Sequence, residues 1–425
     1  GTVVDQFVVG SSSSITIAGN QLTLNPAVNL AYDTQHWVVY PAGAIQALGG
    51  QLESAELVTT FTTKEANYQL WTTGYNAYGA LGQNDVLNKS SPVQIPGTTW
   101  ENLGQFQGTG YGGGMAIKSD GTLWTWGTQG TYGALGLNSR DPGTQYSSPT
   151  QVPGTWSTAS IQADNGMGVK SDGTLWTWGR NNVCGELADG TTIDRSSPVQ
   201  VGTDTTWSKT FGQQAIAGGP FAAMKTDGSL WSWGAGNHGS PGQNNRTQYD
   251  SPVQVGTDTT WSKLTGGYDM MAAIKTDGTL WVWGGNYNGQ LGLNQQGPGP
   301  SLFEASSPTQ LPGTWSEIAN LARHCVGLRA DGTLWSWGYG EQGQLGVNNR
   351  TDYSSPMQLP GTTWSKIGRS GSITRAIKTD GTLWVWGTNL WGQLGDNSVA
   401  QKSSPTQIPG TDWHKVGDDY MVKSV

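Results

Sequence analysis

The chain contains little of the chemistry on which most enzymes depend. Only 12% of its 425 residues are charged, and it has four histidines and two cysteines. The histidines lie far apart and lack the spacing of metal ligands; they are His36, His238, His324 and His414. The motifs GxSxG, HExxH and DxDxDG are missing, as is a phosphate-binding glycine loop. We therefore expect a protein that is not an enzyme and holds no metal or cofactor.

Further shortages exclude other classes of protein. The formal net charge is −8, whereas a nucleic-acid-binding surface needs a basic stripe. No apolar run approaches the ~20 residues of a membrane helix, so we expect no membrane insertion. Cys184 and Cys325 lie in distant repeats, so we expect no disulfide between them. The chain starts at Gly1 without an initiator methionine or signal peptide, which predicts a processed or internal part of something longer.

Glycine and tryptophan are abundant, with 64 and 22 residues, which is typical of loop-rich β proteins. Three markers each recur seven times, at intervals of about 50 residues. The first marker is a Leu-Trp pair, at 70–71, 123–124, 175–176, 230–231, 280–281, 334–335 and 383–384. The second is Ser-Ser-Pro, with Asp-Ser-Pro once, and the third is a lone tryptophan that follows it. The chain therefore contains seven repeats.

Each repeat predicts four short strands. In AIKSDGTLWTWG (116–127), an Asp-Gly pair separates two alternating runs, which is a strong hairpin signal. A glycine-rich loop follows, then a strand such as SPTQVPG, and then one that begins TWS. Four strands in about 50 residues, repeated seven times, predict an all-β fold, a seven-bladed β-propeller over residues 67–425.

The two ends of the repeat region complete one another. The last repeat stops after the VKS strand at 422–424, where an Asp-Gly turn should begin. The first repeat starts at 67, where the partner strand of that hairpin should follow. We expect strand 422–424 to pair antiparallel with strand 68–73, which would close the ring and cover two sheet edges.

These repeats resemble the regulator of chromosome condensation family of seven-bladed propellers. The pattern AxKxDGTLWxWGxNxxGQLG is specific to that family, and its best copies are IKTDGTLWVWGGNYNGQLG (274–292) and IKTDGTLWVWGTNLWGQLG (377–395). The family includes chromatin-bound nucleotide-exchange factors, a secreted β-lactamase inhibitor and many bacterial and phage surface proteins. A histidine typical of the family remains only as His324, and the chain is acidic. We therefore expect neither chromatin binding nor exchange activity, and the SSPxQxPGTxW repeats look most like those of phage structural proteins.

Residues 1–66 differ in kind from the repeats. The stretch ITIAGNQLTLNPAVNLAYDTQHWVVYPAGAI alternates apolar and polar residues, and ELVTTFTT ends the segment. This segment resembles part of a bacterial immunoglobulin-like domain. A complete sandwich of that class needs about 100 residues, so we expect a partial β domain, completed upstream or by a partner chain.

Most of the side chains that first suggest a binding site have a structural interpretation. Twenty of the 22 tryptophans occupy repeat positions, which predicts packing between blades rather than carbohydrate binding. Basic residues precede Ser-Ser-Pro in six repeats, often with an acid nearby. They form either a cationic ring for an anionic glycan or, as we prefer, local salt bridges of the loop. These basic residues are Lys89, Arg140, Arg195, Arg246, Arg350 and Lys402.

Aromatic and apolar residues in the loops are the candidate binding residues. Tyr146, Tyr249 and Tyr353 occupy similar positions in three repeats, near a shared rim. Leu302 and Phe303 form an apolar pair in a long polar loop, and Trp391 replaces the Tyr or Gln of other loops. Rigid aromatic side chains on loops are typical of interface hot spots. The alternative is that each packs on its neighbouring blade.

The expected function is that of a non-enzymatic extracellular structural or binding module. The first hypothesis is a phage virion surface component, in a fibre, tail or capsid, that serves attachment or assembly. A bacterial cell-surface adhesin is the second, and a secreted inhibitor that binds an enzyme through propeller loops is the third. The expected partners are other virion or surface proteins, or a glycan or protein receptor on a host surface.

Overall fold

The computed structural model describes residues 15–18, 21–24, 35–40, 57–62, 68–102, 113–161, 164–181, 184–211, 220–267, 269–295, 304–321, 323–417 and 420–424. The chain divides into two compact units, Gly1–Ala66 and Asn67–Val425. In the first unit, β1 (Ile15–Ala18) pairs antiparallel with β2 (Gln21–Leu24). The longer strands β3 (Gln35–Tyr40) and β4 (Leu57–Thr62) form a second antiparallel pair. That this unit is immunoglobulin-like stays a prediction.

The second unit is built from antiparallel hairpins with Asp-Gly turns. Gly121 has φ 79°, a left-handed conformation that suits glycine. The Asp120 carboxylate accepts hydrogen bonds from the backbone N–H and the hydroxyl of Thr122, at 2.9 and 2.6 Å. That hydroxyl in turn accepts a bond from Trp124 Nε1 at 2.8 Å, which fixes the first indole of the hairpin. The turn and the indole position are thus specified within five residues of sequence.

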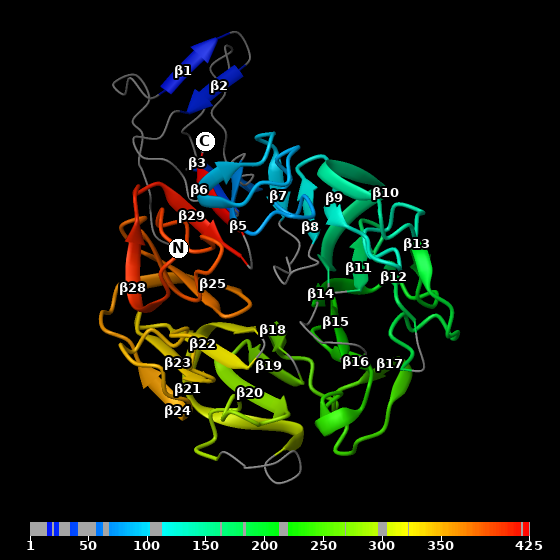
Figure 1. The fold of residues 1–425 in the computed structure, drawn as a ribbon. Coiled ribbons are helices and arrows are strands. Elements are labelled where there is room, and N and C mark those ends of the chain that lie inside the picture. The colour runs from blue at the N-terminus through cyan, green and yellow to red at the C-terminus, as the bar shows by residue number, and fades with distance from the viewer. Residues whose placement is uncertain are drawn as a thin grey trace. The chain divides into compact units, whose positions relative to one another are not determined.

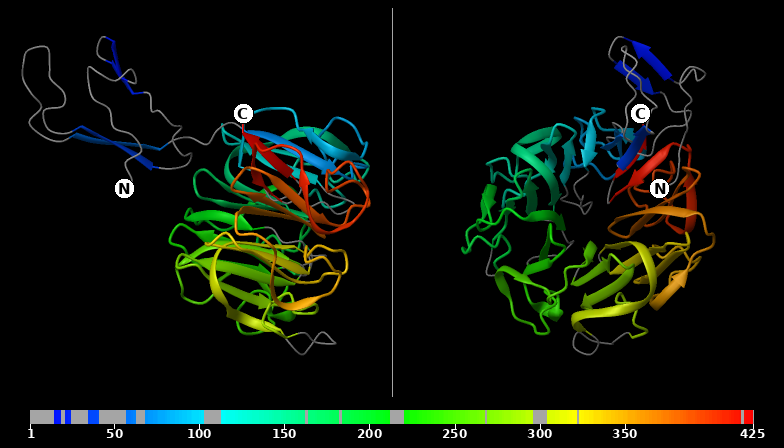
Figure 2. Two further views of the ribbon diagram at one scale, coloured as in Figure 1. Left: turned by 90° about the vertical axis from the view of Figure 1, so that its left-hand side faces the viewer. Right: turned by 180° about the vertical axis from the view of Figure 1, so that it is seen from behind.

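Four strands form the repeating group, and we call them first to fourth in chain order within a repeat. Figure 1 shows the groups arranged around a central axis, and Figure 2 shows the same ring from its side and from behind. The groups are β29 (Trp413–Val416), β30 (Tyr420–Ser424), β5 (Tyr68–Gly74) and β6 (Lys89–Gln94); β7 (Trp100–Asn102), β8 (Gly113–Lys118), β9 (Thr122–Thr128) and the start of β10 (Gln145–Ile161); the end of β10, β11 (Asn165–Lys170), β12 (Leu175–Gly179) and β13 (Arg195–Gln200); β14 (Trp207–Phe211), β15 (Phe221–Lys225), β16 (Leu230–Gly234) and β17 (Tyr249–Gln254); β18 (Trp261–Gly267), β19 (Met270–Lys275), β20 (Thr279–Gly284) and the start of β21 (Ala305–Leu321); the end of β21, β22 (His324–Arg329), β23 (Leu334–Gly338) and β24 (Tyr353–Gln358); and β25 (Trp364–Ser370), β26 (Ile373–Lys378), β27 (Leu383–Gly387) and β28 (Lys402–Ile408).

The strands of this unit join into four sheets, of eleven, four, seven and four strands, within the described residues. The sequence predicted separate fourth and first strands in every repeat, but β10 and β21 each run through both positions for 17 residues. At these two places only three residues separate the apolar residue after the Gln of the fourth-strand position from the next tryptophan, as in Val152-Pro-Gly-Thr-Trp156. Other linkers, such as Val201-Gly-Thr-Asp-Thr-Thr-Trp207, are longer and break the strand.

The C-terminal strand β30 pairs antiparallel with β5, the first strand of the unit. The register places Tyr420 opposite Thr72 and Ser424 opposite Tyr68. Figure 1 shows the red C-terminal strands beside the blue β5 and β6. One strand group therefore combines strands from both ends of residues 67–425.

The tryptophans hold neighbouring groups together, which confirms their structural interpretation. In six of the seven groups the second tryptophan of the hairpin is fully buried, and its Nε1 donates to a backbone carbonyl of the preceding group, as in Trp283 to Ser240 O at 2.9 Å. The same bond recurs at 2.8 to 3.0 Å for Trp126, Trp178, Trp233, Trp337 and Trp386. Each of these buried indoles thus contributes both apolar area and one directed hydrogen bond.

The first tryptophans of the hairpins are partly buried and stack with a cation. In each group one Lys or Arg lies over two indole rings, at 3.5 to 5.6 Å from their centroids. Burial lowers the pKa of one of these cations, Lys170. The repeated lysine of the pattern is therefore explained by cation–π packing.

The boundary between the β25–β28 group and the β29–β6 group, which we call the terminal seam, is packed differently. Thr73 stands where the other hairpins have their buried tryptophan, and its hydroxyl donates to Gln393 O at 2.8 Å. Arg375 is fully buried here, and its guanidinium donates to the same carbonyl at 3.0 Å. A long side chain from β26 thus occupies volume that an indole fills elsewhere.

Candidate binding surface on the third–fourth loops

The loops that join third to fourth strands lie at one end of the groups, which we call the loop end. The Asp-Gly hairpins lie at the opposite end, the hairpin end, because the strands between them run the full length of each group. Each loop contains a glycine with positive φ that touches the next group. Gly392 has φ 76°, and a Cβ there would lie 2.6 Å from Cα of Ser90. Close backbone contact thus fixes each loop against its neighbour.

A buried asparagine holds several of these loops in shape. Asn389 is fully buried; its amide donates to Ser398 O at 2.9 Å and its carbonyl accepts from Leu394 N–H at 2.9 Å. Asn76 makes the same kind of contacts, to Asp85 O at 3.0 Å and from Leu81 N–H at 2.8 Å. The loops are therefore rigid supports for the side chains that they expose.

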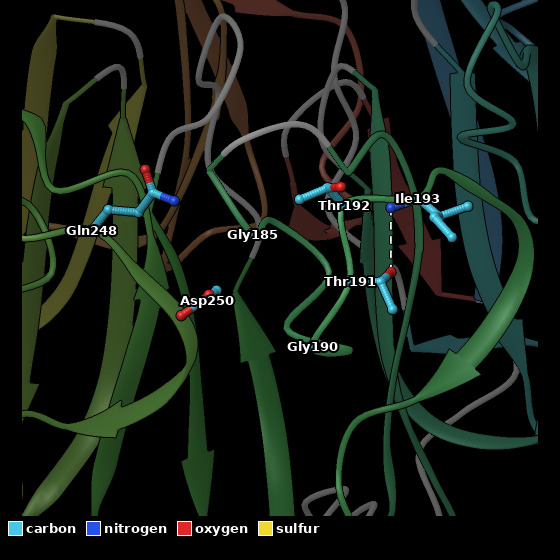
Figure 3. A pocket seen from close by; sticks show the side chains of 7 residues that line it. All are labelled: Gly185, Gly190, Thr191, Thr192, Ile193, Gln248 and Asp250. Carbon is cyan, nitrogen blue, oxygen red and sulfur yellow. Dashed lines mark hydrogen bonds between the residues drawn. The ribbon is translucent and has the colours of Figure 1, made fainter.

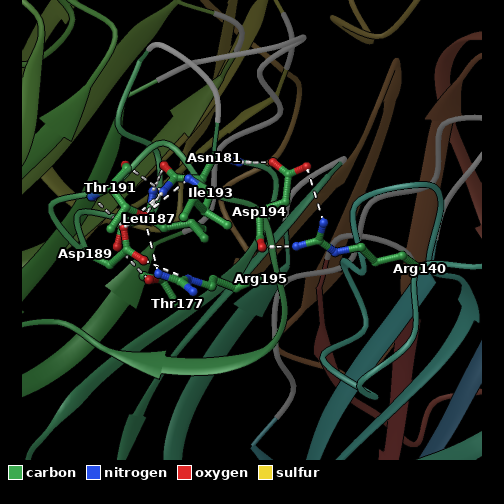
Figure 4. Close-up of polar contacts among 9 residues, drawn as sticks. All are labelled: Arg140, Thr177, Asn181, Leu187, Asp189, Thr191, Ile193, Asp194 and Arg195. Carbon is green, nitrogen blue, oxygen red and sulfur yellow. Dashed lines mark hydrogen bonds and ion pairs between the residues drawn. The ribbon is translucent and has the colours of Figure 1, made fainter.

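Figure 4 shows the corresponding clamp in the β12–β13 loop. The Asn181 amide donates to the Asp189 carboxylate at 3.0 Å and to Thr191 O at 2.9 Å. Arg195 pairs with the other Asp189 oxygen at 2.9 Å. In the same view, Arg140 of the preceding group donates to the backbone carbonyl of Asp194 and thus ties two groups together.

The basic residues before Ser-Ser-Pro are mostly engaged in such contacts, as the preferred interpretation of the sequence expected. Lys89 pairs with Asp85 at 2.7 Å, and Lys402 with Asp396 at 3.5 Å. The pair of Arg246 is with Glu304 of the next group at 2.7 Å, while Arg350 is exposed. Hydrogen bonds from Lys89 lower the pKa of Asp85, as expected for a paired carboxylate. These cations act as loop clamps.

The residue before the loop glycine varies between the repeats, and in several repeats it contacts the next group. Trp391 touches Tyr75, with ring centroids 5.3 Å apart, and the Arg180 guanidinium stacks on Tyr132 at 5.2 Å. Elsewhere the contact is polar, as between Asn288 and Asp352 at 2.8 Å. The residues at this position are Tyr78, Tyr132, Cys184, His238, Asn288, Gln342 and Trp391. A nearly constant frame therefore presents six residue types at the seven boundaries.

The three candidate tyrosines pack within the propeller. Tyr146 and Tyr249 are partly buried against the apolar clusters around Trp178 and Trp233. The Tyr353 hydroxyl accepts a hydrogen bond from the Asn349 amide at 2.8 Å. These contacts favour the packing alternative that the sequence left open. Leu302 and Phe303 lie outside the described residues, and their assignment stays a prediction.

Trp391, the remaining candidate, is 50% exposed, and the sequence did not predict which side chains surround it. It lies against Tyr75, which in turn contacts Tyr78 with ring centroids 6.3 Å apart. Leu390 beside it is 62% exposed. The signal that could have identified Tyr75 was its repeat position, which in the other repeats holds Ala, Gly, Thr, Arg or another Tyr.

A pocket of about 360 Å³ lies where the β12–β13 loop meets the start of β17 (Figure 3). Its lining consists of Gly185, Gly190, Thr191, Thr192, Ile193, Gln248 and Asp250. Asp250 is its one carboxylate, which does not make an acid–base pair. No group of three His, Cys, Asp or Glu side chains within the described ranges is placed to hold a metal. The residues that line this pocket form no catalytic constellation.

A cluster of titratable side chains also lies at the boundary of the β14–β17 and β18–β21 groups. His238 contacts Glu304 through Nδ1 and the Tyr287 hydroxyl through Nε2, the latter at 2.6 Å. Burial raises the pKa of nearby Asp269 to about 6, and Glu304 adds to the effect. The charges of His238 and Arg323 oppose the shift.

The raised pKa predicts how stability depends on pH. Because folded Asp269 has a pKa of about 6 and an unfolded aspartate about 3.8, the stabilising effect of its protonation is complete below pH 4. It is lost as the pH rises through 6. We expect Asp269→Asn to raise the free energy of unfolding at pH 8 by on the order of 1–2 kcal/mol, after allowance for partial exposure, and much less at pH 4.

Denaturant titration of the wild type and the variant at both pH values measures this. Asp277→Asn is the matched control, because hydrogen bonds from Thr279 lower the pKa of Asp277 and its ionised form is the stabilising one. Equal changes for Asp269→Asn at pH 4 and pH 8 would rule out the proposed titration.

Comparison with known proteins identifies the repeat. Residues 120–164, 277–325, 331–373 and 380–417 match the "Regulator of chromosome condensation (RCC1) repeat" model. Residues 261–290 match a second model with the same description. Within these ranges, the chain matches the RCC1 repeat. The histidine that the sequence singled out in this family, His324, is buried and its Nε2 lies 3.2 Å from Thr374 Oγ1 of the next group.

Two proteins of Arabidopsis thaliana are similar to large parts of the chain. The chain is 28% identical over 302 residues to the ultraviolet-B receptor UVR8 of Arabidopsis thaliana, covering 66% of this chain and 63% of that protein. It is 29% identical over 215 residues to the mitochondrial RCC1 domain-containing protein RUG3 of Arabidopsis thaliana, covering 49% and 46%. The match thus spans less than two thirds of either relative.

Solved structures establish the propeller fold. Human WBSCR16 superposes with a TM-score of 0.68 at 19% identity, over 84% of this chain and 99% of that one. Prp20p of Saccharomyces cerevisiae gives 0.69 at 17% identity, over 84% and 91%. The second unit is therefore an all-β propeller. Within the described ranges, no helix is both long and apolar enough to cross a membrane.

Proposed function

We propose that the chain is a non-enzymatic binding module in which a seven-bladed propeller, closed by the pairing of β30 with β5, presents its loop end to a protein partner. The observation that carries the proposal is the contrast within the repeats. Positions in strands and hairpins are nearly constant and engaged in packing, whereas the residue before each loop glycine differs from one repeat to another. Binding residues on a rigid frame are concentrated in loops of this kind.

Relatives with the same repeat support a protein as the partner. The structure of yeast Prp20p is described together with its binding properties to Gsp1p and histones, and a second yeast structure contains Kap60 bound to RCC1. The formal charge of −8 disfavours nucleic-acid partners, which need a basic surface. We therefore carry over protein binding and not the individual partners.

The proposed setting is extracellular, on a phage virion surface, with residues 1–66 as part of an immunoglobulin-like domain. Support comes from the low charge and regularity of the repeats and from the alternating pattern of the first unit. Mass spectrometry of the native particles and of the culture medium tests this setting. Recovery with capsid or tail proteins supports it. Recovery as a secreted chain, alone or bound to an enzyme, overturns it in favour of an adhesin or an inhibitor.

A further inference from the structure

Exposed apolar side chains are concentrated in two loops that belong to the groups on either side of the terminal seam. The described residues include seven large apolar side chains that are exposed, and five of these belong to two loops, 75–88 and 388–401. The five are Val86, Leu87, Leu390, Trp391 and Val399, between 49% and 65% exposed. We call the surface of these two loops the seam surface. Soluble proteins seldom expose large apolar side chains together without a partner.

The two loops are joined directly to one another. Asn397 N–H donates to Ser90 O at 3.0 Å across the seam. The Trp391 and Tyr75 rings, one from each loop, are 5.3 Å apart. Since both loops belong to adjacent groups and touch in this way, a single partner can contact both.

The seam surface is also held in place before any partner arrives. Trp391 N–H donates to Gln393 Oε1 at 2.7 Å, and the buried amides of Asn389 and Asn76 fix the two loops from below. Side chains on a rigid support lose less conformational entropy on binding. The exposed indole is therefore available at low entropic cost.

The chemistry of the seam surface favours a protein over a sugar. A sugar would use the aromatic rings together with directed polar groups, but the loop amides of Asn389 and Asn76 are already engaged. The aliphatic side chains around Trp391 instead suit the apolar side chains of a protein interface.

Charge further restricts the partner. Lys89 and Lys402 beside the seam surface are paired with Asp85 and Asp396, so they offer little repulsion to a cation. Residues 67–425 hold 25 acidic and 21 basic residues, a formal charge of −4, which attracts basic partners over long distances. An indole face is moreover the best aromatic acceptor for a cation.

We propose that the seam surface binds a basic segment of a partner protein, with an arginine or lysine over the exposed face of Trp391 and an aliphatic side chain against Leu390. This inference rests on the proposed binding function and specifies where and what the propeller binds.

Selection of a displayed library of 12-residue peptides on the intact chain tests the proposal. Enriched peptides are then titrated against the wild type, Trp391→Ala and Leu390→Ser. The matched control is Ile193→Ser, which changes a side chain that is 56% exposed on a different loop. Melting curves check that each variant is folded, which we expect because all three residues are exposed.

We expect enriched peptides that contain Arg or Lys together with Leu, Ile or Phe. Their affinity should fall at least about tenfold in Trp391→Ala and less than about twofold in Ile193→Ser. It should also fall several-fold between low and physiological salt, as a charge-steered interaction does.

Other outcomes overturn the proposal in distinguishable ways. Some peptides could lack positive charge, or could bind Trp391→Ala as tightly as the wild type but bind more weakly to variants elsewhere at the loop end. Either result contradicts binding at the seam surface and leaves loop-end binding intact. Peptides that bind only at the hairpin end, or none at all, count against both. A glycan array that gives binding lost in Trp391→Ala replaces the protein partner with a sugar.

Discussion

Removal of residues 420–425 is expected to prevent the propeller unit from reaching a soluble folded state. β30 lies between β29 and β5, so its loss exposes the edges of both strands. It also removes Met421 and Val422, which are fully buried, at a cost of about 1.5–3 kcal/mol for each side chain. Together with the lost strand pairing, this consumes a large part of a domain stability of about 5–15 kcal/mol.

The soluble fraction, far-ultraviolet circular dichroism and light scattering of the shortened chain measure this effect. A chain shortened by Val425 alone is the control and should behave like the wild type. If the chain without residues 420–425 melts at the wild-type temperature and stays soluble, the fold of residues 67–425 does not depend on the β5–β30 pairing.

Trp283→Ala is expected to lower the free energy of unfolding by about 3–5 kcal/mol. The indole is fully buried among residues of its own group and of the preceding group. Its Nε1 donates to Ser240 O at 2.9 Å. Trp283→Phe keeps most of the apolar volume but leaves that buried carbonyl without the indole donor, so a smaller loss of about 1–3 kcal/mol is expected.

Chemical denaturation of the three proteins gives these values. Trp391→Ala is the matched control, because its indole is 50% exposed and a surface substitution usually changes stability by less than about 0.5 kcal/mol. Similar losses for Trp283→Ala and Trp391→Ala would contradict the separation of packing tryptophans from surface ones.

The sequence predicts the frame well because the frame is local and repeated. An Asp-Gly turn, a Thr two residues after the Asp and a Trp two residues after that form their hydrogen bonds within a single hairpin. Burial of the repeated tryptophans follows from the same repetition, since every group needs the same contact with its neighbour. Even the long strands β10 and β21 could have been predicted from the short linkers at 153–155 and 312–314.

What the sequence did not reveal depends on contacts between different groups. Trp391 was identified by its difference from the other loops, but Tyr75 was not, because the two are adjacent only when the last and first repeats meet. The burial of Arg375 can likewise be explained only by its position beside Thr73, because both side chains donate to Gln393 O. Thr73 lies more than 300 residues away along the chain. The cluster of His238, Glu304 and Asp269 combines two groups in the same way.

The candidate tyrosines show a limit of repeat-based inference. Their shared position suggested a shared rim, but a position that recurs in several repeats is more often one that every group needs for packing. Tyr146 and Tyr249 follow that rule, since both pack on apolar clusters of the propeller. Side chains that interrupt the repetition, such as Trp391, are better candidates for binding.

The central claim is that the loop end binds a partner. Photo-crosslinking of the chain in native particles or in the secreted fraction tests it most directly. A photoreactive residue is placed at the loop end by Leu390→p-benzoylphenylalanine, and at the hairpin end by Ser119→p-benzoylphenylalanine; both native side chains are exposed. The account predicts a cross-linked partner protein from position 390 and none from position 119. Cross-links from position 119 alone, or from neither position while a partner copurifies, would contradict it.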